Sequence, residues 1–256
     1  LPNSTYRKGG ETARHLMAHE PKNYCCPVCR KAKAQRRRKD RKVNKKRDLG
    51  PAPTKFGAQV TADLLIKRKG DPGYSGQEKE EYGDDMESDL FVGHDKVARN
   101  GLVIFDRGTK WLSCYPKARR TAKDVKASFR DFVKPDEKVK SFFCDNGPEL
   151  IAAAGEIKWI RSTSTSGMPE TNGVIERRVH QVKAGTRVNL CQSGLTHKWW
   201  HEASRHFCFA YNIQVIDGES VYHNRHQTGH YDGQIIPFGA LVDAMLPPDD
   251  LSLIHI

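Results

Sequence analysis

The chain has 256 residues, of which 37% are hydrophobic and 29% are charged, and its formal net charge is +12. This length allows one mid-sized core and one small additional module, and the composition is that of a soluble globular protein. No apolar run approaches the roughly 18 residues of a membrane span, and no signal peptide opens the chain. We therefore expect no membrane association.

The positive charge is concentrated in one block. Residues 30–48 contain twelve Lys or Arg and two Asp, a net charge of +10, which leaves only +2 for the rest of the chain. Such a block suits phosphates better than a packed core, because each phosphate contact releases counterions. A solvated linker or a nuclear-localisation signal is the alternative. The residues expected to bind nucleic acid here are Arg36, Arg37, Arg38, Lys39, Arg41 and Lys42.

Composition divides the chain into four regions. They are a Cys/His-rich module (1–30), a basic linker (31–55), an α/β core (56–215) with an acidic insertion (70–98), and a C-terminal extension (216–256). The insertion is predicted to be flexible, because residues 70–95 hold nine acidic residues against one Lys. Because the chain begins with Leu1 and ends in the dissimilar LSLIHI, we expect a fragment with a truncated extension.

Strands and helices alternate within the core. Periodicity predicts strands at 58–66, 101–106, 110–115, 139–144 and 157–161, and helices at 121–133, 148–154, 173–190 and 197–213. The second and third strands form a hairpin across Arg107, Gly108 and Thr109. This order predicts an α/β fold, a ribonuclease-H-like mixed sheet flanked by helices.

Three acidic residues lie within or beside apolar elements of this fold. Asp63 lies in the first strand, Asp145 directly follows the strand of FFCDNGPEL, and Glu176 lies near the start of the long helix. A carboxylate among apolar neighbours must be paired or serve a site. If the three converge, they can hold two Mg²⁺ ions about 3.5–4 Å apart for phosphodiester displacement.

Each acid also has a simpler interpretation. Asp145 precedes Asn-Gly and can be a turn residue, Glu176 can complement the helix dipole, and Asp63 can be a hydrogen-bonded strand acid. Glu170 competes as the third acid, but it is expected in the loop before the helix.

The long helix is predicted to have one charged and one apolar side. Helical spacing places His180, Lys183 and Arg187 on the same face as Glu176, while Ile175, Val179, Val182 and Val188 lie on another. A basic stripe led by an acid suits bound DNA, and a solvated face is the alternative.

The Cys/His-rich module predicts a zinc site. His15 and His19 are one helical turn apart, and Cys26 and Cys29 form a CPVC knuckle. Two imidazoles and two thiolates form a closed tetrahedral site, which is structural rather than catalytic. Because so short a segment has little core, the metal would supply its folding free energy. Cys25 can replace Cys26, and chance spacing is the other interpretation.

Several motifs together resemble retrotransposon and retroviral integrases, particularly the copia type. They are TADLL, GLVIFDRGTKWLSCYP, FFCDNGPEL and STSTSGMPETNGVIERR in the core, and WWHEASRHFCFAYN and IPFGALVD after it. The resemblance runs from Asp63 to about Pro248 and implies that Asp63, Asp145 and Glu176 are the metal-binding triad, with Asp106 structural. Integrases similarly carry a His-His-Cys-Cys zinc module before the core, and they act as multimers.

The sequence departs from this family in two intervals. Thirty residues separate Asp145 from Glu176, fewer than is usual, and the six residues between His19 and Cys26 are fewer than in the retroviral form.

These observations predict a nuclear DNA integrase of a mobile element. Its expected partners are element DNA ends, target DNA and further copies of the chain, and its expected cofactors are Mg²⁺ or Mn²⁺ and structural Zn²⁺. A decayed or domesticated nucleic-acid-binding homologue is one alternative, favoured by the short acid interval and the odd ends. A ribonuclease-H-type nuclease is another, disfavoured by the zinc module and basic linker.

Overall fold

The computed structural model describes residues 12–33, 53–66, 98, 100–160 and 169–242. The predicted acidic insertion, apart from residue 98, lies outside these residues. So do the basic residues Arg36, Arg37, Arg38, Lys39, Arg41 and Lys42. Within the described part of the chain, no helix is long and apolar enough to cross a membrane.

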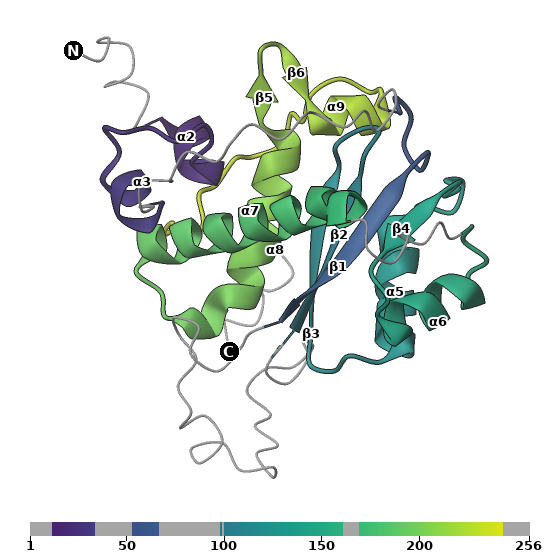
Figure 1. Cartoon of the computed structure of the whole chain (residues 1–256). Coiled ribbons are helices and arrows are strands. Elements are labelled where there is room, and N and C mark those ends of the chain that lie inside the picture. The colour runs from purple at the N-terminus through teal and green to yellow at the C-terminus, as the bar shows by residue number, and fades with distance from the viewer. Residues whose placement is uncertain (1–11, 34–52, 67–97, 99, 161–168, 243–256) are drawn as a thin grey trace, which may run out of the picture.

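A four-stranded mixed sheet forms the centre of the molecule (Figure 1). Its strands are β1 (Val60–Ile66), β2 (Asn100–Asp106), β3 (Leu112–Lys117) and β4 (Phe142–Cys144), in the order β3-β2-β1-β4. The first three strands pair antiparallel, and β4 pairs parallel to β1. An antiparallel meander followed by a helical crossover to a parallel strand is the predicted ribonuclease-H-like arrangement, which is confirmed.

Helices cover both faces of the sheet. The helices α5 (Ala122–Phe132) and α6 (Pro148–Glu156) lie on one face, and α7 (Pro169–Ser193) and α8 (Trp200–Ile213) lie on the other (Figure 1). Two hydrophobic clusters fill the two interfaces, because successive strand residues point to opposite faces. On β1, Val60 and Ala62 pack toward α5, while Leu65 packs toward α7 and α8.

Local sequence explains α5 well. The Thr121 side chain accepts a hydrogen bond from the Asp124 backbone N–H and so caps the helix. Val125, Phe129 and Phe132 are buried, as their spacing predicted. The predicted hairpin is also confirmed, with Phe105 opposite Leu112 at the end of the β2–β3 pairing.

Two element boundaries differ from the prediction. Residues 157–160 form no strand: Lys158 has a left-handed backbone (φ 59°), although the Phe142 N–H donates a hydrogen bond to Ile160 O (2.9 Å). Trp159 instead stacks on Phe129, with ring centroids 4.6 Å apart. The long helix α7 begins at Pro169 rather than near residue 173, so Glu176 lies about two turns inside it.

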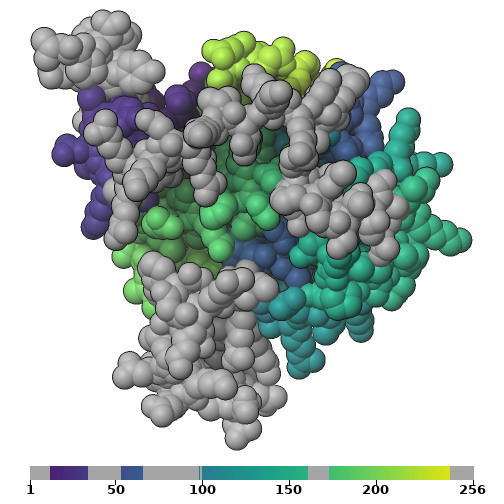
Figure 2. Space-filling model, in the orientation of Figure 1, coloured from purple at the N-terminus to yellow at the C-terminus, as the bar shows by residue number. Residues whose placement is uncertain are grey.

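The N-terminal module packs against the second helical layer. Its helices are α2 (Ala13–Ala18) and α3 (Pro27–Ala32); α2 contacts α7 and α8, and α3 contacts α7. In Figure 2 the purple surface of this module adjoins the green surface of the helices. The 3-10 turn η1 (His197–Trp199) precedes α8, and β5 (Val215–Ile216), β6 (Glu219–Ser220) and α9 (Val221–His226) follow it.

Candidate functional site

The parallel pairing of β1 and β4 aligns two of the predicted acids. Ala62 of β1 is paired with Cys144 of β4. Asp63 and Asp145 are therefore the next residues along the two paired segments. The side chains of Ala62 and Cys144 belong to the cluster on the α5 face. Because neighbouring residues along a strand alternate, Asp63 and Asp145 are directed to the α7 face. Each accepts a backbone hydrogen bond, Asp63 from Leu64 N (2.7 Å) and Asp145 from Gly147 N (3.1 Å).

Glu176 comes to the same place from α7, which contacts β1 and β2. Burial raises the pKa of the Asp63 carboxyl above its ordinary value, and the Leu64 N–H bond opposes this. The negative charges of Asp145 and Glu176 raise the pKa of Asp63 further, and the positive charge of Lys183 lowers it. The structure therefore brings all three predicted acids, and one predicted basic residue, within electrostatic range of one another.

The other side chains of α7 separate as the helical spacing predicted. Ile175, Val179, Val182 and Val188 are buried, while Glu176, His180 and Arg187 are exposed and Lys183 is half-buried. The competing acid Glu170 lies in the first turn of α7 rather than in a loop, and its side chain lies outside the described residues. Glu176, His180 and Arg187 therefore form an exposed stripe along α7.

The three carboxylates do not gather around one point. Among the described residues, the His-His-Cys-Cys group is the one set of three or more His, Cys, Asp or Glu side chains whose ligand atoms lie close enough together to hold a single metal ion. Carboxylate oxygens are the ligands Mg²⁺ prefers, and a pair of ions about 3.5–4 Å apart does not require every acid to reach one ion. The donor set therefore fits divalent cations.

The His-His-Cys-Cys group has the geometry of a zinc site. The ligand atoms of His15, His19, Cys26 and Cys29 lie within 4.8 Å of one another and are buried. His19 Nδ1 is 3.6 Å from Cys26 Sγ and 3.5 Å from Cys29 Sγ, and His15 Nε2 is 3.5 Å from Cys29 Sγ. Zn–S bonds of about 2.3 Å and Zn–N bonds of about 2.0 Å at tetrahedral angles place N and S about 3.5 Å apart. The residues fit zinc.

The protonation chemistry of this group also suits a metal. Burial lowers the pKa of His19 to about 4, so its imidazole is neutral at pH 7 and has a lone pair to offer. Burial raises the pKa of the Cys29 thiol, which means that a bound cation must displace its proton. Lys33 lies close by, donating from Nζ to His19 O (2.8 Å), and its positive charge favours thiolates.

The structure decides between the two adjacent cysteines. Cys26 is buried and belongs to the group, whereas Cys25 is exposed. His19 is not within α2 as its spacing from His15 suggested: it is the C-cap, with a left-handed backbone (φ 52°). This turn, rather than a continuous helical face, aims both imidazoles at the cysteines.

Sequence reasoning missed two residues with long-range contacts: Gln192 contacts the zinc group, and Arg225 is structural. Gln192, near the end of α7, contacts the His19 ring, although 173 positions separate the two. Arg225 of α9 lies over the Phe56 and Trp111 rings and pairs with Glu137. No local signal identifies either residue, because their partners are distant in the sequence. Asp106 is fully buried and accepts bonds from Gly57 N and Thr109 N, so it holds two loops together.

The sequence matches no protein-family model and no curated protein. Among solved structures, the chain is similar to the HTLV-2 integrase catalytic core domain in complex with magnesium, in its trimeric form. The two sequences are 13% identical, the matched region covers 68% of this chain and 99% of that chain, and the TM-score is 0.45. The catalytic core domain of BIV integrase has 13% identity, covering 67% and 95%, with a TM-score of 0.44. A simian T-cell lymphotropic virus intasome in complex with the PP2A regulatory subunit B56 gamma has 14% identity, covering 77% and 63%, with a TM-score of 0.43.

Proposed function

We propose that the chain is a DNA integrase of a retrotransposon, of the copia type, or of a related mobile element. One observation carries the proposal: Asp63, Asp145 and Glu176 come from three separate elements, and the charges of the other two both act on Asp63. Paired strand positions and an overlying helix converge on one face of the sheet. A cluster of acids that raises the pKa of a half-buried carboxyl costs stability, and such clusters are typical of functional sites.

The chain's own residues have distinct roles in this proposal. Asp63 and Asp145 are held at the sheet by the backbone bonds from Leu64 and Gly147, so their carboxylates are oriented before any ion binds. Glu176 closes the site from α7. When bound, Mg²⁺ or Mn²⁺ ions activate the attacking oxygen and stabilise the leaving oxygen of a phosphodiester.

Positive residues position the DNA. Lys183 acts electrostatically on Asp63 and lies on the helix that carries Glu176. His180 and Arg187 are exposed on the same helix. We assign these residues, with the basic block at 36–42, to phosphate contacts, which give affinity with little sequence specificity. Element ends and target DNA would both bind here, in an assembly of several copies and in the nucleus.

Joining of a DNA end tests this function. A labelled duplex that mimics an element end is incubated with supercoiled plasmid and Mg²⁺ or Mn²⁺, using the wild-type chain, Glu176→Gln and Glu156→Gln. Glu156 is the matched control, because it is exposed and pairs with Lys126 away from the acids. We expect the wild type and Glu156→Gln to join the label to plasmid and Glu176→Gln to lose joining.

Other outcomes separate the alternatives. Nicked plasmid without joined label would identify a nuclease of the ribonuclease-H type. Salt-sensitive DNA binding with neither product would identify a non-catalytic homologue, since phosphate contacts survive without the chemistry. Joining by Glu176→Gln at the wild-type level would show that Glu176 is not the third acid.

A further inference from the structure

The imidazole of His19 has partners on both of its ring nitrogens. Nδ1 faces Cys26 Sγ (3.6 Å) and Cys29 Sγ (3.5 Å), and Nε2 contacts the side-chain oxygen Oε1 of Gln192. Gln192 lies near the end of α7 and is half-buried, so an α7 side chain reaches the zinc module.

Chemistry fixes the direction of the Gln192 bond. The neutral imidazole carries one proton, on either Nδ1 or Nε2. A metal ligand must offer a lone pair, and the nitrogen that faces the two sulfurs is Nδ1. The proton is therefore on Nε2, and the group that receives it must be an acceptor. The amide oxygen of Gln192 is such an acceptor, whereas its amide nitrogen would leave two donors facing each other.

We propose that Gln192 is a positioning residue of the zinc site. Its amide oxygen accepts the His19 Nε2–H bond, holds the ring in the Nδ1-binding tautomer and makes Nδ1 a stronger ligand. Outer hydrogen bonds of this kind commonly orient metal-binding histidines. The inference rests on the proposed zinc site and is independent of the proposed catalysis.

Other contacts place the module where Gln192 can act. Gln181 Nε2 of α7 donates to Glu20 Oε2 (2.9 Å), and Gln214, which follows α8, donates to Glu20 O. Met17 and Ala18 of α2 belong to the hydrophobic cluster beneath α7 and α8. The zinc module is thus packed on the helix that carries Glu176, and the Gln192 bond joins that helix to a metal ligand.

Zinc affinity tests the proposal without any activity measurement. The full chain and its variants are titrated with zinc in competition with a chromophoric chelator, after circular dichroism shows that each zinc-loaded variant is folded. Gln192→Leu removes the acceptor at similar volume, Gln192→Glu keeps an acceptor, and Gln181→Leu removes a contact to Glu20 that involves no ligand. We expect about 10–100-fold weaker binding for Gln192→Leu, and wild-type or tighter binding for Gln192→Glu and Gln181→Leu.

The outcomes separate the positioning role from a merely structural one. Retained affinity in Gln192→Glu supports the proposal, because Gln and Glu share the acceptor oxygen that Leu lacks, and retained affinity in Gln181→Leu shows that losing another α7 contact to the module does not have the same effect. Equal zinc affinity of Gln192→Leu and the wild type would overturn it, and so would Gln192→Glu binding as weakly as Gln192→Leu. Failure of the wild-type chain to bind zinc would instead overturn the zinc site itself.

Discussion

Asp63 of β1 and Asp145, which directly follows β4, occupy matching positions on two neighbouring parallel segments. Both lie one residue beyond the Ala62–Cys144 pair that ends the β1–β4 pairing. The two residues are 82 positions apart in the sequence. Adjacent strands lie about 4.8 Å apart, so two carboxylates at matching positions repel each other unless a cation or a proton lies between them. Their alignment is costly for the fold alone and useful for a metal site.

This cost predicts that Asp63→Asn stabilises the chain without Mg²⁺ or Mn²⁺. The pKa of Asp63 is raised in the folded state, so the unfolded chain loses this proton at lower pH. As pH rises from about 4, ionisation of Asp63 therefore lowers the free energy of unfolding of the wild type. The variant has no carboxyl at this position and does not show this loss. We expect a melting temperature for Asp63→Asn about 2–4 °C higher at pH 7, corresponding to about 1 kcal/mol, and no difference near pH 3. Differential scanning calorimetry of the zinc-loaded chain without Mg²⁺ or Mn²⁺ measures both. A less stable variant at pH 7 would contradict the account.

The zinc ligands predict a clear difference between two adjacent cysteines. Cys26→Ser should lose stoichiometric zinc and unfold the module, because a zinc site of this kind supplies folding free energy. Cys25→Ser should retain one zinc per chain, since Cys25 is exposed and outside the group. Elemental analysis of the purified chains gives the metal content. Zinc loss in Cys25→Ser with retention in Cys26→Ser would reverse the assignment.

The contact between α7 and α8 predicts opposite effects for two glycines of α7. A Cβ at Gly185 would lie 2.0 Å from the Phe207 ring, whereas one at Gly173 meets nothing within 4 Å. Gly185→Ala should destabilise the chain by about 1–3 kcal/mol through overpacking. Gly173→Ala should stabilise it by up to about 1 kcal/mol through helix propensity. Urea unfolding measures both, and a neutral Gly185→Ala would show that the helices can separate without cost.

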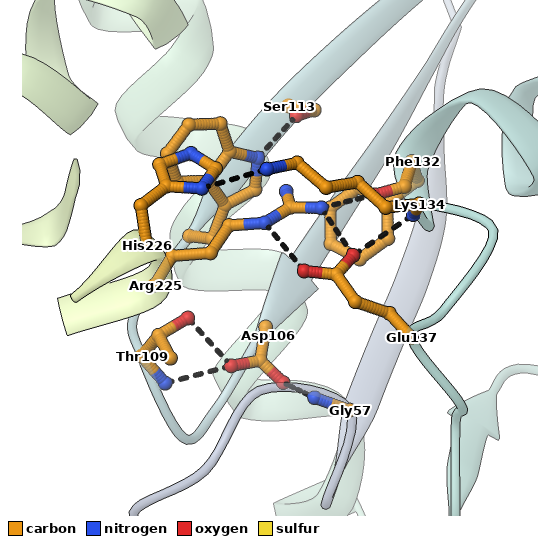
Figure 3. Close-up of polar contacts among 10 residues, drawn as sticks. Gly57, Asp106, Thr109, Ser113, Phe132, Lys134, Glu137, Arg225 and His226 are labelled. Atoms are coloured by element: carbon orange, nitrogen blue, oxygen red, sulfur yellow. Dashed lines mark hydrogen bonds and ion pairs between the residues drawn. The ribbon is translucent and has the colours of Figure 1, made fainter. Parts of the chain in front are cut away.

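Arg225 joins α9 to the end of α5 and to the segment that follows it (Figure 3). Its guanidinium lies 4.0 Å from the Phe56 ring centroid, donates to Phe132 O (2.8 Å), and pairs with Glu137 Oε2 at 2.7 Å. Only 5% of the Arg225 side chain is exposed. Replacing Arg225 would leave the Glu137 carboxylate without the cation that pairs with it.

Arg225→Met should therefore lower the free energy of unfolding by about 3 kcal/mol. Arg225→Lys should recover only part of it, because an ammonium cannot both stack and bind in two places. The matched control is Arg120→Met, which breaks a pair with Glu149 in which the arginine side chain is 43% exposed, and it should cost at most about 1 kcal/mol. Chemical denaturation compares all three. Equal losses for Arg225→Met and Arg120→Met would show that burial of the arginine adds nothing.

Sequence patterns predicted the elements whose causes are local. The Thr121 cap and the spacing of Val125 and Phe129 define α5, and the apolar runs of β1 and β2 with the alternating pattern of β3 define the meander. Residues 157–160 were wrongly predicted as a strand, because a short apolar run does not show whether a neighbouring strand can pair with it; residue 161 of the same prediction lies outside the described residues. The apolar residue at position 159 serves a ring contact instead of strand pairing, because Trp159 stacks on Phe129.

The candidate sites show the same limit. The Cys26 and Cys29 knuckle was recognisable because the two ligands lie close in the sequence, while the choice between Cys25 and Cys26 required burial. The three acids were proposed from their places in the predicted elements, and their roles stay predictions. The proposed role of Gln192 could not be predicted from the sequence, because its contact with His19 joins residues 173 positions apart.

Manganese binding tests most directly whether Asp63, Asp145 and Glu176 form one metal site. Electron paramagnetic resonance of free Mn²⁺ is followed during titration of the wild-type chain, Asp63→Asn, Asp145→Asn, Glu176→Gln and the control Glu156→Gln, each loaded with one zinc per chain and freed of excess zinc. Zinc saturation blocks the thiolate site, which Mn²⁺ disfavours in any case. The account predicts that each of the first three variants binds Mn²⁺ about tenfold or more weakly, on the order of 1.4 kcal/mol, while Glu156→Gln binds as the wild type. Wild-type affinity in Glu176→Gln would contradict the account, because α7 would then contribute no ligand.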